Sequence, residues 1–414
     1  MIVIDKSITL QGEDKTCTII DGCGGELLKE DVVYIKADRV NMSGFTIKNS
    51  AQGYSYEAGI AMKEANHCVI TDNILTENEW GMDVRDSQYN SITDNVISSS
   101  SGGIHLCFSY NNLVSNCTIE QIEVRGISIY VSAGNIIVSN SFVDCGLEIY
   151  NNPSSNEENL NTIVDNTVNG KPLVYLENES NVIIDDAGQV ILLNCEDITV
   201  RNLDLYYAST GVRVVDSKRI TISSNVISNN VHGISIVESQ HVVIEENIIE
   251  DNWGTGVGIY YTFTEKIEIL NNTITNNGKG IYVFNCLSGK TIIKNNEISN
   301  NEEGIDISSR SCDISWNNIC DNSEYGVIVW NSKGNQIYAN NFERNGVHAY
   351  FEYFREIGGN TWNTLDIGNY WDDWNGRGPK VIRGKQIVIG IGFGIGIPWF
   401  NLDWQPAKEP YDIE

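Results

Sequence analysis

Long hydrophobic runs are missing from this sequence of 414 residues. A helix needs roughly 20 consecutive apolar residues to cross a bilayer, and no stretch offers them. Long amphipathic windows of helical period are missing too, and proline occurs only 6 times, whereas glycine occurs 37 times. We therefore expect neither membrane insertion nor a fold built from helices.

Basic residues are scarce relative to acidic ones. The chain has 27 Lys and Arg against 55 Asp and Glu, which gives a formal net charge of −28. Nucleic acid is excluded as a partner, because its binding requires cations that neutralise phosphate. Anionic membrane surfaces are disfavoured for the same reason. An acidic polysaccharide would be repelled unless a bound cation or a local Arg/Lys patch intervened.

The 10 cysteines include no CxxC pair, which argues against a zinc ribbon. Most lie in strand-like positions, where a free Cys behaves as a small hydrophobic residue, so we expect buried free thiols. Disulfides between neighbouring segments, Cys107 with Cys117 or Cys312 with Cys320, stay open as alternatives. Cysteine usage does not settle the redox compartment.

Metal-ligand patterns are also missing. The 5 His and 4 Met are scattered without paired spacing, so copper binding has little support. No compact oxygen-ligand motif is present, although calcium could still bind among outward-facing Asp and Glu side chains. The metal question therefore stays open from the sequence.

What the sequence does contain is a repeat. Asn225 follows Gly211, Asn247 follows Gly233 and Asn318 follows Gly304, each at a distance of 14 residues. Successive repeat glycines are mostly 22 to 24 residues apart. A fixed period in this range is typical of a solenoid.

Each period contains three short apolar runs. The run after the glycine alternates, as in Ile234, Ser235 and Ile236, which predicts a half-buried strand. A second run precedes the Asn and a third follows it. Three strands per turn predict a parallel β-helix whose coils stack at about 4.8 Å. One coil cannot bury its apolar side alone, so stacking supplies the core.

The bends between strands carry the polar residues of the repeat. We expect the repeat Gly to adopt positive φ, and the repeat Asn to tolerate the left-handed region. Stacked Asn side chains are expected to bond from coil to coil as an internal ladder. A column of small residues such as Ser87, Ser109 and Ser132 is expected to play the same structural role.

We interpret the chain as one elongated domain. The β-helix is expected over residues 1–350, with irregular coils at about 151–204 that include a polar loop at 151–159, and a capping segment over 351–414. Tryptophans crowd into this tail, which suits the atypical end of a solenoid. A sugar-binding platform is the alternative for these aromatic residues.

The first residues, Met1 to Ile4, already show a strand pattern and no signal peptide. We expect either an intracellular protein or one whose upstream portion has been removed. A start in mid-coil favours the second.

Several motifs carry a resemblance to a known family. The glycine-led coils resemble the right-handed parallel β-helix repeat of pectin-lyase-like proteins. Gly170-Lys-Pro-Leu-Val-Tyr-Leu, Ala187-Gly-Gln-Val-Ile-Leu-Leu and Gly368-Asn-Tyr-Trp-Asp-Asp-Trp look like the NosD-type family of bacterial and archaeal proteins. The resemblance implies a periplasmic, extracellular or cell-surface setting. It leaves the activity open, because the family includes carbohydrate-binding, sugar-hydrolysing and copper-maturation-linked members.

The residues two and four positions after each repeat Gly are predicted to point outward. On this face we expect a cluster of Asp83, Arg85, His105, Tyr130 and Glu148. Asp83 and His105 should lie about one strand spacing apart, so that the carboxylate orients the imidazole. Arg85 could neutralise a uronate, while His105 or Tyr130 takes a proton, as a β-elimination lyase requires. A solvated polar face is the alternative.

A second feature of the same face is aromatic. The predicted ligand-binding residues are Tyr260, Tyr282, Phe284, Asp306, Trp330 and Tyr350. Exposed rings on a rigid sheet suit stacking against sugar rings. Coverage by a loop or by the C-terminal segment is the alternative.

A glycoside hydrolase has less support than a lyase. Inverting enzymes hold two carboxylates roughly 6.5–9.5 Å apart. Asp83 and Glu148 are three coils apart, which is roughly 14 Å at the backbone. The glycine-flanked His and downstream Arg-x-Lys of polygalacturonases are missing.

Three functions are therefore carried forward. The first is an extracytoplasmic protein that binds a polysaccharide or surface glycan along one sheet face. The second is a polysaccharide lyase of the same fold. The third is a structural surface or adhesion module without enzymatic activity.

Overall fold

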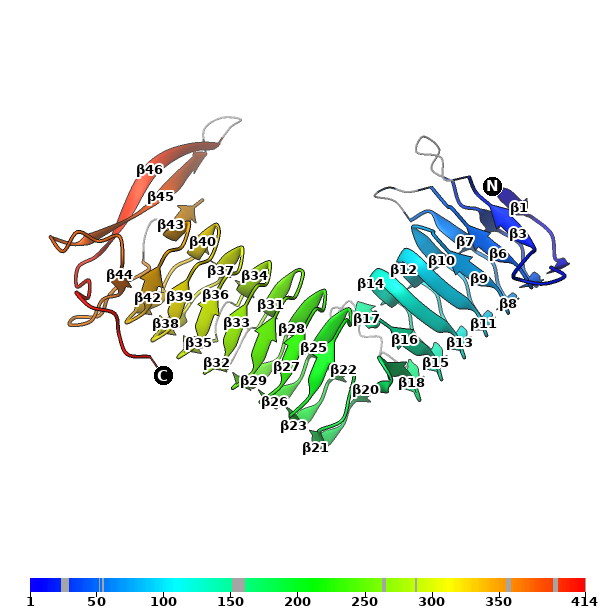
Figure 1. Cartoon of the computed structure of the whole chain (residues 1–414), viewed down its shortest axis with the longest axis horizontal. Coiled ribbons are helices and arrows are strands. Elements are labelled where there is room, and N and C mark those ends of the chain that lie inside the picture. The colour runs from blue at the N-terminus through cyan, green and yellow to red at the C-terminus, as the bar shows by residue number, and fades with distance from the viewer. Residues whose placement is uncertain are drawn as a thin grey trace. The chain divides into compact units, whose positions relative to one another are not determined.

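The computed structural model describes residues 1–23, 30–51, 53, 56–150, 161–262, 266–286, 289–354, 359–389 and 394–413. Within these ranges the chain forms strands, turns and bends, and no helix, so no described helix could span a membrane. The strands follow one another as stacked coils with three strands each (Figure 1). The predicted all-β parallel β-helix is confirmed. The predicted polar loop at 151–159 lies outside the described residues.

The coils group into two compact units. The first contains Met1–Tyr175, Ala187–Gln189 and Tyr206–Thr210, and the second contains Leu176–Asp186, Val190–Leu205 and Gly211–Glu414. The change from one unit to the other falls in the region where the sequence predicts irregular coils. There, β20 (Lys171–Glu177) runs antiparallel to β19 (Thr167–Val168), whereas the regular coils pair in parallel.

In the first unit the strands form three parallel series, and the long strands β12 and β14 each contribute to two of them. The series that follows the repeat glycines contains β1 (Ile2–Ile4), β4 (Val33–Ile35), β7 (Ala58–Lys63), β10 (Trp80–Arg85), β12 (Val96–Cys107), β14 (Thr118–Tyr130) and β17 (Leu147–Tyr150). The second contains β2 (Thr9–Gln11), β5 (Asn41–Ser43), β8 (Val69–Thr71), β11 (Ser91–Thr93), β13 (Leu113–Ser115), β15 (Ile136–Val138) and β18 (Thr162–Val164). The third adds β3 (Ile19–Asp21), β6 (Thr46–Lys48), β9 (Ile74–Thr76), β16 (Ser141–Val143) and β19.

The second unit repeats this plan. Its glycine-led series contains β22 (Gln189–Leu193), β25 (Thr210–Val215), β28 (His232–Val237), β31 (Thr255–Tyr260), β34 (Lys279–Phe284), β37 (Glu303–Ser308), β40 (Tyr325–Trp330) and β43 (Val347–Tyr353). The next contains β21 (Ser180–Ile184), β23 (Glu196–Arg201), β26 (Lys218–Ser223), β29 (Gln240–Glu245), β32 (Ile267–Leu270), β35 (Thr291–Lys294), β38 (Cys312–Ser315) and β41 (Gln336–Tyr338). The last contains β24 (Asp204–Tyr206), β27 (Val226–Ser228), β30 (Ile248–Glu250), β33 (Thr273–Thr275), β36 (Glu297–Ser299), β39 (Asn318–Cys320), β42 (Asn341–Glu343) and β44 (Tyr370–Trp371).

The repeat asparagines form the predicted internal ladder. Asn247 is buried, and its Oδ1 accepts hydrogen bonds from the backbone N–H of Asn225 (3.0 Å) and from Asn225 Nδ2 (2.9 Å). Its own Nδ2 donates to the carbonyl of Ile222 (2.9 Å) and to Asn272 Oδ1 (3.0 Å). Each amide therefore satisfies backbone groups in one coil and fixes the register of the next.

The backbone of the bends differs from the expectation. The left-handed residue is the one before the ladder Asn, for example Glu246 with φ of 57° before Asn247. The repeat Gly does not adopt positive φ either. A Cβ on Gly233 would lie 2.5 Å from the carbonyl oxygen of Gly256, so close approach between coils is what requires glycine there.

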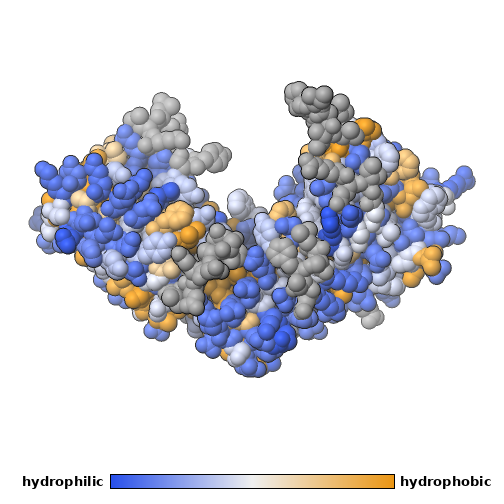
Figure 2. Space-filling view, turned by 180° about the vertical axis from the view of Figure 1, so that it is seen from behind, coloured by the Kyte–Doolittle hydropathy of each residue, from blue (hydrophilic) through white to orange (hydrophobic). Residues whose placement is uncertain are grey.

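Between the buried polar ladders, the interior is filled by apolar side chains. Stacked Ile, Val and Leu side chains fill both units, and all ten cysteines are free thiols, seven of them buried. The expectation of free thiols is confirmed, and neither alternative disulfide forms. Figure 2 shows the opposite character outside, where hydrophilic side chains dominate and hydrophobic ones gather in separate patches.

The last coil is closed by aromatic residues from the tail. Trp371 stacks on Phe342 with ring centroids 4.3 Å apart and planes at 5°, and Trp362 is buried beside it. The buried Asp403 accepts hydrogen bonds from the backbone N–H of Asn369 (2.8 Å) and from Trp371 Nε1 (2.9 Å). Beyond this closure, β45 (Lys380–Ile389) and β46 (Gly394–Asp403) form an antiparallel hairpin, whose first strand pairs with β43.

The ladder yields a stability prediction. Asn247→Ala should lower the free energy of unfolding by about 2–4 kcal/mol, because it leaves a buried N–H of Asn225 and the carbonyl of Ile222 without partners. Urea unfolding followed by circular dichroism measures the change. Thr273→Ala, at an exposed strand position, is the matched control. Equal midpoints for both variants would contradict a stabilising ladder.

Candidate functional site

The predicted polar cluster assembles in the first unit. Asp83 in β10 lies in register with His105 in β12, and His105 Nδ1 is 2.8 Å from Asp83 Oδ1. Arg85 Nε donates to Asp83 Oδ2 at 2.6 Å. The side chains of Asp83 and His105 are only 8% and 7% exposed, so the face is covered rather than openly solvated. Because Asp83 accepts from Nδ1, neutral His105 carries its lone pair on Nε2.

Two aromatic rings pack against the imidazole and against each other. The Tyr56 ring stacks on His105 with centroids 5.2 Å apart, and the Trp80 ring lies 5.1 Å away at a tilt of 34°. Gly102 makes room for Trp80, since a Cβ there would lie 2.3 Å from the indole. Tyr56 belongs to the loop between β6 and β7, of which residues 52, 54 and 55 lie outside the described residues. The rings shield the Asp83–His105 pair from water.

Two guanidinium groups join this cluster. Arg85 lies 4.3 Å above the Tyr56 ring, and one of its terminal nitrogens, Nη2, is buried without a hydrogen-bond partner among the described residues. Arg125 donates to the hydroxyl of Tyr150 from Nη2 (2.8 Å) and Nε (3.1 Å). Both arginines line a pocket of about 430 Å³ together with His105 and Tyr130. We call this the unit 1 pocket.

The other two predicted catalytic residues, Tyr130 and Glu148, lie in different surroundings. Tyr130 is exposed, lines the unit 1 pocket and packs edge-on against Phe108 at 5.8 Å. Glu148 is buried, and its Oε2 accepts a hydrogen bond from Thr210 Oγ1 at 3.0 Å. It is not among the residues that line the pocket. The structure therefore brings Asp83, Arg85, His105 and Tyr130 together and turns Glu148 to another partner.

The predicted aromatic run lies in the second unit as two groups. The ring of Tyr282 contacts the rings of Tyr260 and Phe284, with centroids 5.7 and 5.9 Å apart, respectively. Trp330 and Tyr350 form the other contact at 6.4 Å. The strand β37 separates the groups, so Phe284 and Trp330 are two strand spacings apart, or about 10 Å at the backbone. All five residues are half-buried.

Asp306 occupies the strand between these groups, and it is not an open ligand-binding residue. Its side chain is 3% exposed and pairs with Lys279 Nζ, which also binds Glu303 Oε2 at 2.6 Å. Burial raises the pKa of Asp306 to about 6, and the hydrogen bond from Lys279 offsets only part of that rise. Asp306 therefore lies beside Tyr282 on the same face of the sheet, as an ion-pair partner of Lys279.

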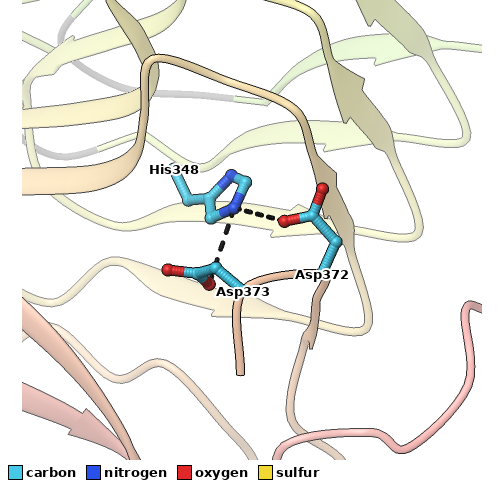
Figure 3. Close-up of side chains that lie close together, drawn as sticks. All are labelled: His348, Asp372 and Asp373. Atoms are coloured by element: carbon cyan, nitrogen blue, oxygen red, sulfur yellow. Dashed lines mark hydrogen bonds and ion pairs between the residues drawn. The ribbon is translucent and has the colours of Figure 1, made fainter. Parts of the chain in front are cut away.

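A third cluster lies where the tail meets the last coil (Figure 3). His348 Nε2 is 2.7 Å from Asp372 Oδ1 and 3.5 Å from Asp373 Oδ1. Among the described residues this is the one group of three His, Cys, Asp or Glu ligand atoms close enough for a metal ion. It borders a cavity of about 760 Å³.

The hydrogen bonds around His348 disfavour a metal. Asn345 Oδ1 accepts from Asn322 N and Nδ2, so its own Nδ2 faces His348 Nδ1 at 3.2 Å. Nδ1 must accept this bond, which places the imidazole proton on Nε2, where it is donated to Asp372. Asp372 Oδ2 in turn accepts from the backbone N–H of Arg344 at 2.7 Å. These contacts join the tail, which carries Asp372 and Asp373, to the last coil, which carries His348 and Arg344.

The family model described as periplasmic copper-binding protein (NosD) matches residues 4–180 and 192–376. The chain belongs to the NosD family. No curated protein sequence matches it.

Solved structures resemble the chain at low identity. The periplasmic alginate epimerase AlgG is 16% identical with a TM-score of 0.38, over 72% of this chain and 65% of that chain. The A-module of the mannuronan C-5 epimerase AlgE4 from Azotobacter vinelandii is 14% identical with a TM-score of 0.26, over 86% and 89%. DFA-IIIase from Arthrobacter chlorophenolicus A6 without its lid is 11% identical with a TM-score of 0.28, over 74% and 66%. The chain thus spans about 65% of the AlgG length, and no functional inference rests on these matches.

Among the described residues, no set of side chains fits the copper ion named in the NosD family description. His348 has the wrong tautomer, and His105 is held by Asp83. The sulfur atoms of Met42, Met62 and Met82 are buried in the core, away from any His cluster.

Sequence reasoning missed several residues of both sites. Four of these residues stand immediately before a repeat glycine: Trp80, Arg125, Lys279 and Tyr325, whose ring contacts that of Tyr350. This position forms its own column, for example Trp80 beside Gly102 and Gly102 beside Arg125. The residues immediately before the repeat glycines were therefore the signal from which the sequence could have predicted these four. Tyr56 comes from a loop without periodic signal, so the sequence could only suggest it.

The raised pKa of Asp306 predicts a pH effect on stability. The folded state keeps a proton on Asp306 up to about pH 6, whereas an ordinary aspartate loses it near pH 3.8, so this group's contribution to stability falls as pH rises between those values. Asp306→Asn should therefore gain stability relative to wild type over that window. Urea midpoints at pH 4, 5, 6 and 7 measure the difference, and parallel curves would contradict the assignment.

Proposed function

We propose that this NosD-family chain is an extracytoplasmic protein that binds a polysaccharide on the outer side of its glycine-led strands, and that the unit 1 pocket takes a sugar carrying a carboxylate. The pocket combines flat aromatic faces with two guanidinium groups. Aromatic rings bind the apolar faces of sugars, and guanidinium binds carboxylate in a fixed, two-pronged geometry.

The observation that carries this proposal is the orphan nitrogen of Arg85. A buried N–H without a partner costs free energy, so its presence calls for an acceptor. Asp83 already accepts the hydrogen bond from Arg85 Nε, which holds the guanidinium group in place. A ligand carboxylate approaching over Tyr56 would supply the missing acceptor. A local pair of arginines is also the feature that an acidic sugar needs in order to approach a chain of net charge −28.

The aromatic groups of the second unit support the same function independently. Tyr260, Tyr282 and Phe284 form one platform, and Trp330 with Tyr350 forms another. Their backbone separation of about 10 Å corresponds to two coils, so a chain of sugar rings can contact both platforms at once. The rigid strands hold the platforms in place, which lowers the entropic cost of binding.

A lyase is the second candidate, and the Asp83–His105 hydrogen bond favours it. The carboxylate fixes the imidazole so that Nε2 can take a proton from a carbon next to a uronate carboxylate. Arg85 or Arg125 would neutralise that carboxylate, and the hydroxyl of Tyr130 could donate a proton to the leaving oxygen. Glu148 has no part in this version, since it binds Thr210.

The binding proposal is tested by removing the two charges. Arg85→Gln with Arg125→Gln should weaken retention of a uronate polymer in affinity electrophoresis by about 10- to 100-fold, because two charge-assisted contacts are lost. Tyr282→Ala with Trp330→Ala should weaken retention of neutral and acidic glycans alike. Trp253→Ala, which removes a ring that is 80% exposed elsewhere, is the control. If wild type is retained by no glycan on an array, the chain is a structural module and the proposal is wrong.

The lyase is tested separately by incubating the protein with uronic-acid polymers. Wild type should generate the ultraviolet absorbance of an unsaturated product, and His105→Ala should abolish it, because the base is lost while Arg85 and Arg125 still hold the polymer. The absorbance is measured with and without calcium, so that a reaction that requires this cation is also detected. Binding without product in all conditions would leave the binding function intact and remove the enzyme.

A further inference from the structure

The hairpin β45–β46 differs in composition from the rest of the chain. Residues 374–402 contain no Asp or Glu, although the chain has 55 of them, and they include Arg377, Lys380, Arg383 and Lys385. Lys380 pairs with Asp373, and Lys385 lies beside Glu352 of β43. Arg377 and Arg383 are exposed. A chain of net charge −28 therefore contains a locally cationic stretch at residues 374–402.

The same hairpin exposes large apolar side chains. Val381, Ile397, Trp399 and Phe400 are 48%, 45%, 44% and 61% exposed. Such a density of exposed apolar residues on one short element marks an interaction surface. Figure 2 shows hydrophobic surface at the end of the second unit that carries the hairpin.

Strand register shows how charge and apolar surface combine. Arg383 lies opposite Phe400 and Lys385 opposite Pro398, so cations and apolar groups share one face. Trp399 and Ile397 lie opposite Gly384 and Gln386 on the other face. β46 pairs only with β45 among the described strands, so its outer edge is open.

We propose that this hairpin docks the protein on an anionic lipid surface. Arg383 and Lys385 bind the negative headgroups, and Phe400 and Val381, on the same face of the hairpin, bury apolar surface at the boundary between headgroups and acyl chains. The unpaired edge of β46 limits docking to the interface, because backbone groups without partners are not tolerated in the hydrocarbon region. The hairpin therefore lies on the surface and does not cross the membrane.

The overall negative charge does not forbid this contact. Electrostatic forces decay over about 8 Å at physiological ionic strength, so a surface senses mainly the charges nearest to it. The hairpin extends away from the stacked coils of its unit (Figure 1). Its cations therefore meet the lipid before the acidic side chains of the coils do.

The test is flotation of the full chain with vesicles. Wild type should bind vesicles that contain phosphatidylglycerol, bind phosphatidylcholine vesicles at least about 10-fold more weakly, and dissociate in 0.5 M salt. Arg383→Gln with Lys385→Gln should weaken binding about 30-fold, and Phe400→Ala at least about 10-fold. Lys36→Gln with Lys294→Gln, which removes two exposed charges outside the hairpin, should bind as wild type does.

Four results would overturn the proposal. Two of them need only wild type: binding to neither vesicle, or equal binding to both vesicles in high salt. The third is that the hairpin variants bind as wild type does while keeping the wild-type circular dichroism spectrum. The fourth is that sedimentation shows wild type to be a dimer that Phe400→Ala converts to monomers, in which case a second copy of the chain occupies this surface.

Discussion

The amide ladder of the repeat asparagines is the interaction on which the rest of the structure depends. Each buried Asn accepts from the backbone and side chain of one coil and donates to carbonyl groups of another, as Asn247 does between Asn225 and Asn272. Buried amides of this kind are costly unless every donor and acceptor is paired. A coil shifted by one residue would unpair them all and turn its apolar side chains outward. The ladder thus makes register nearly obligatory.

Obligatory register is what lets residues far apart in sequence act together. Asp83 and His105 meet because both occupy the same position in neighbouring coils. The aromatic platforms of the second unit arise in the same way, since Tyr260 and Phe284 lie in register. A rigid scaffold of this kind presents side chains without further ordering, which suits the recognition of an extended polymer.

These same rules explain what the sequence could and could not predict. The period and the alternation of Ile and Val were sufficient for the fold, and spacing alone placed Asp83 beside His105. Glu148 keeps its predicted register beside Ser128, but its carboxylate accepts a hydrogen bond from Thr210, which follows the irregular region and which no period places there. Tyr56 and the orphan nitrogen of Arg85 depend on a loop path and on side-chain torsions, which no period encodes. The tautomer of His348 is set by an Asn in contact with it, so composition could not exclude a metal there.

The measurement that tests ladder-imposed register most directly is disulfide trapping in the first unit. Thr71 and Thr93 lie in register in β8 and β11, with their hydroxyl oxygens 3.0 Å apart. Thr71→Cys with Thr93→Cys should form a disulfide under mild oxidation, detected by mass spectrometry, because neighbouring coils are about 4.8 Å apart. Thr71→Cys with Ser115→Cys, two coils apart, should not. Trapping of the second pair and not the first would contradict the register on which both candidate sites rest.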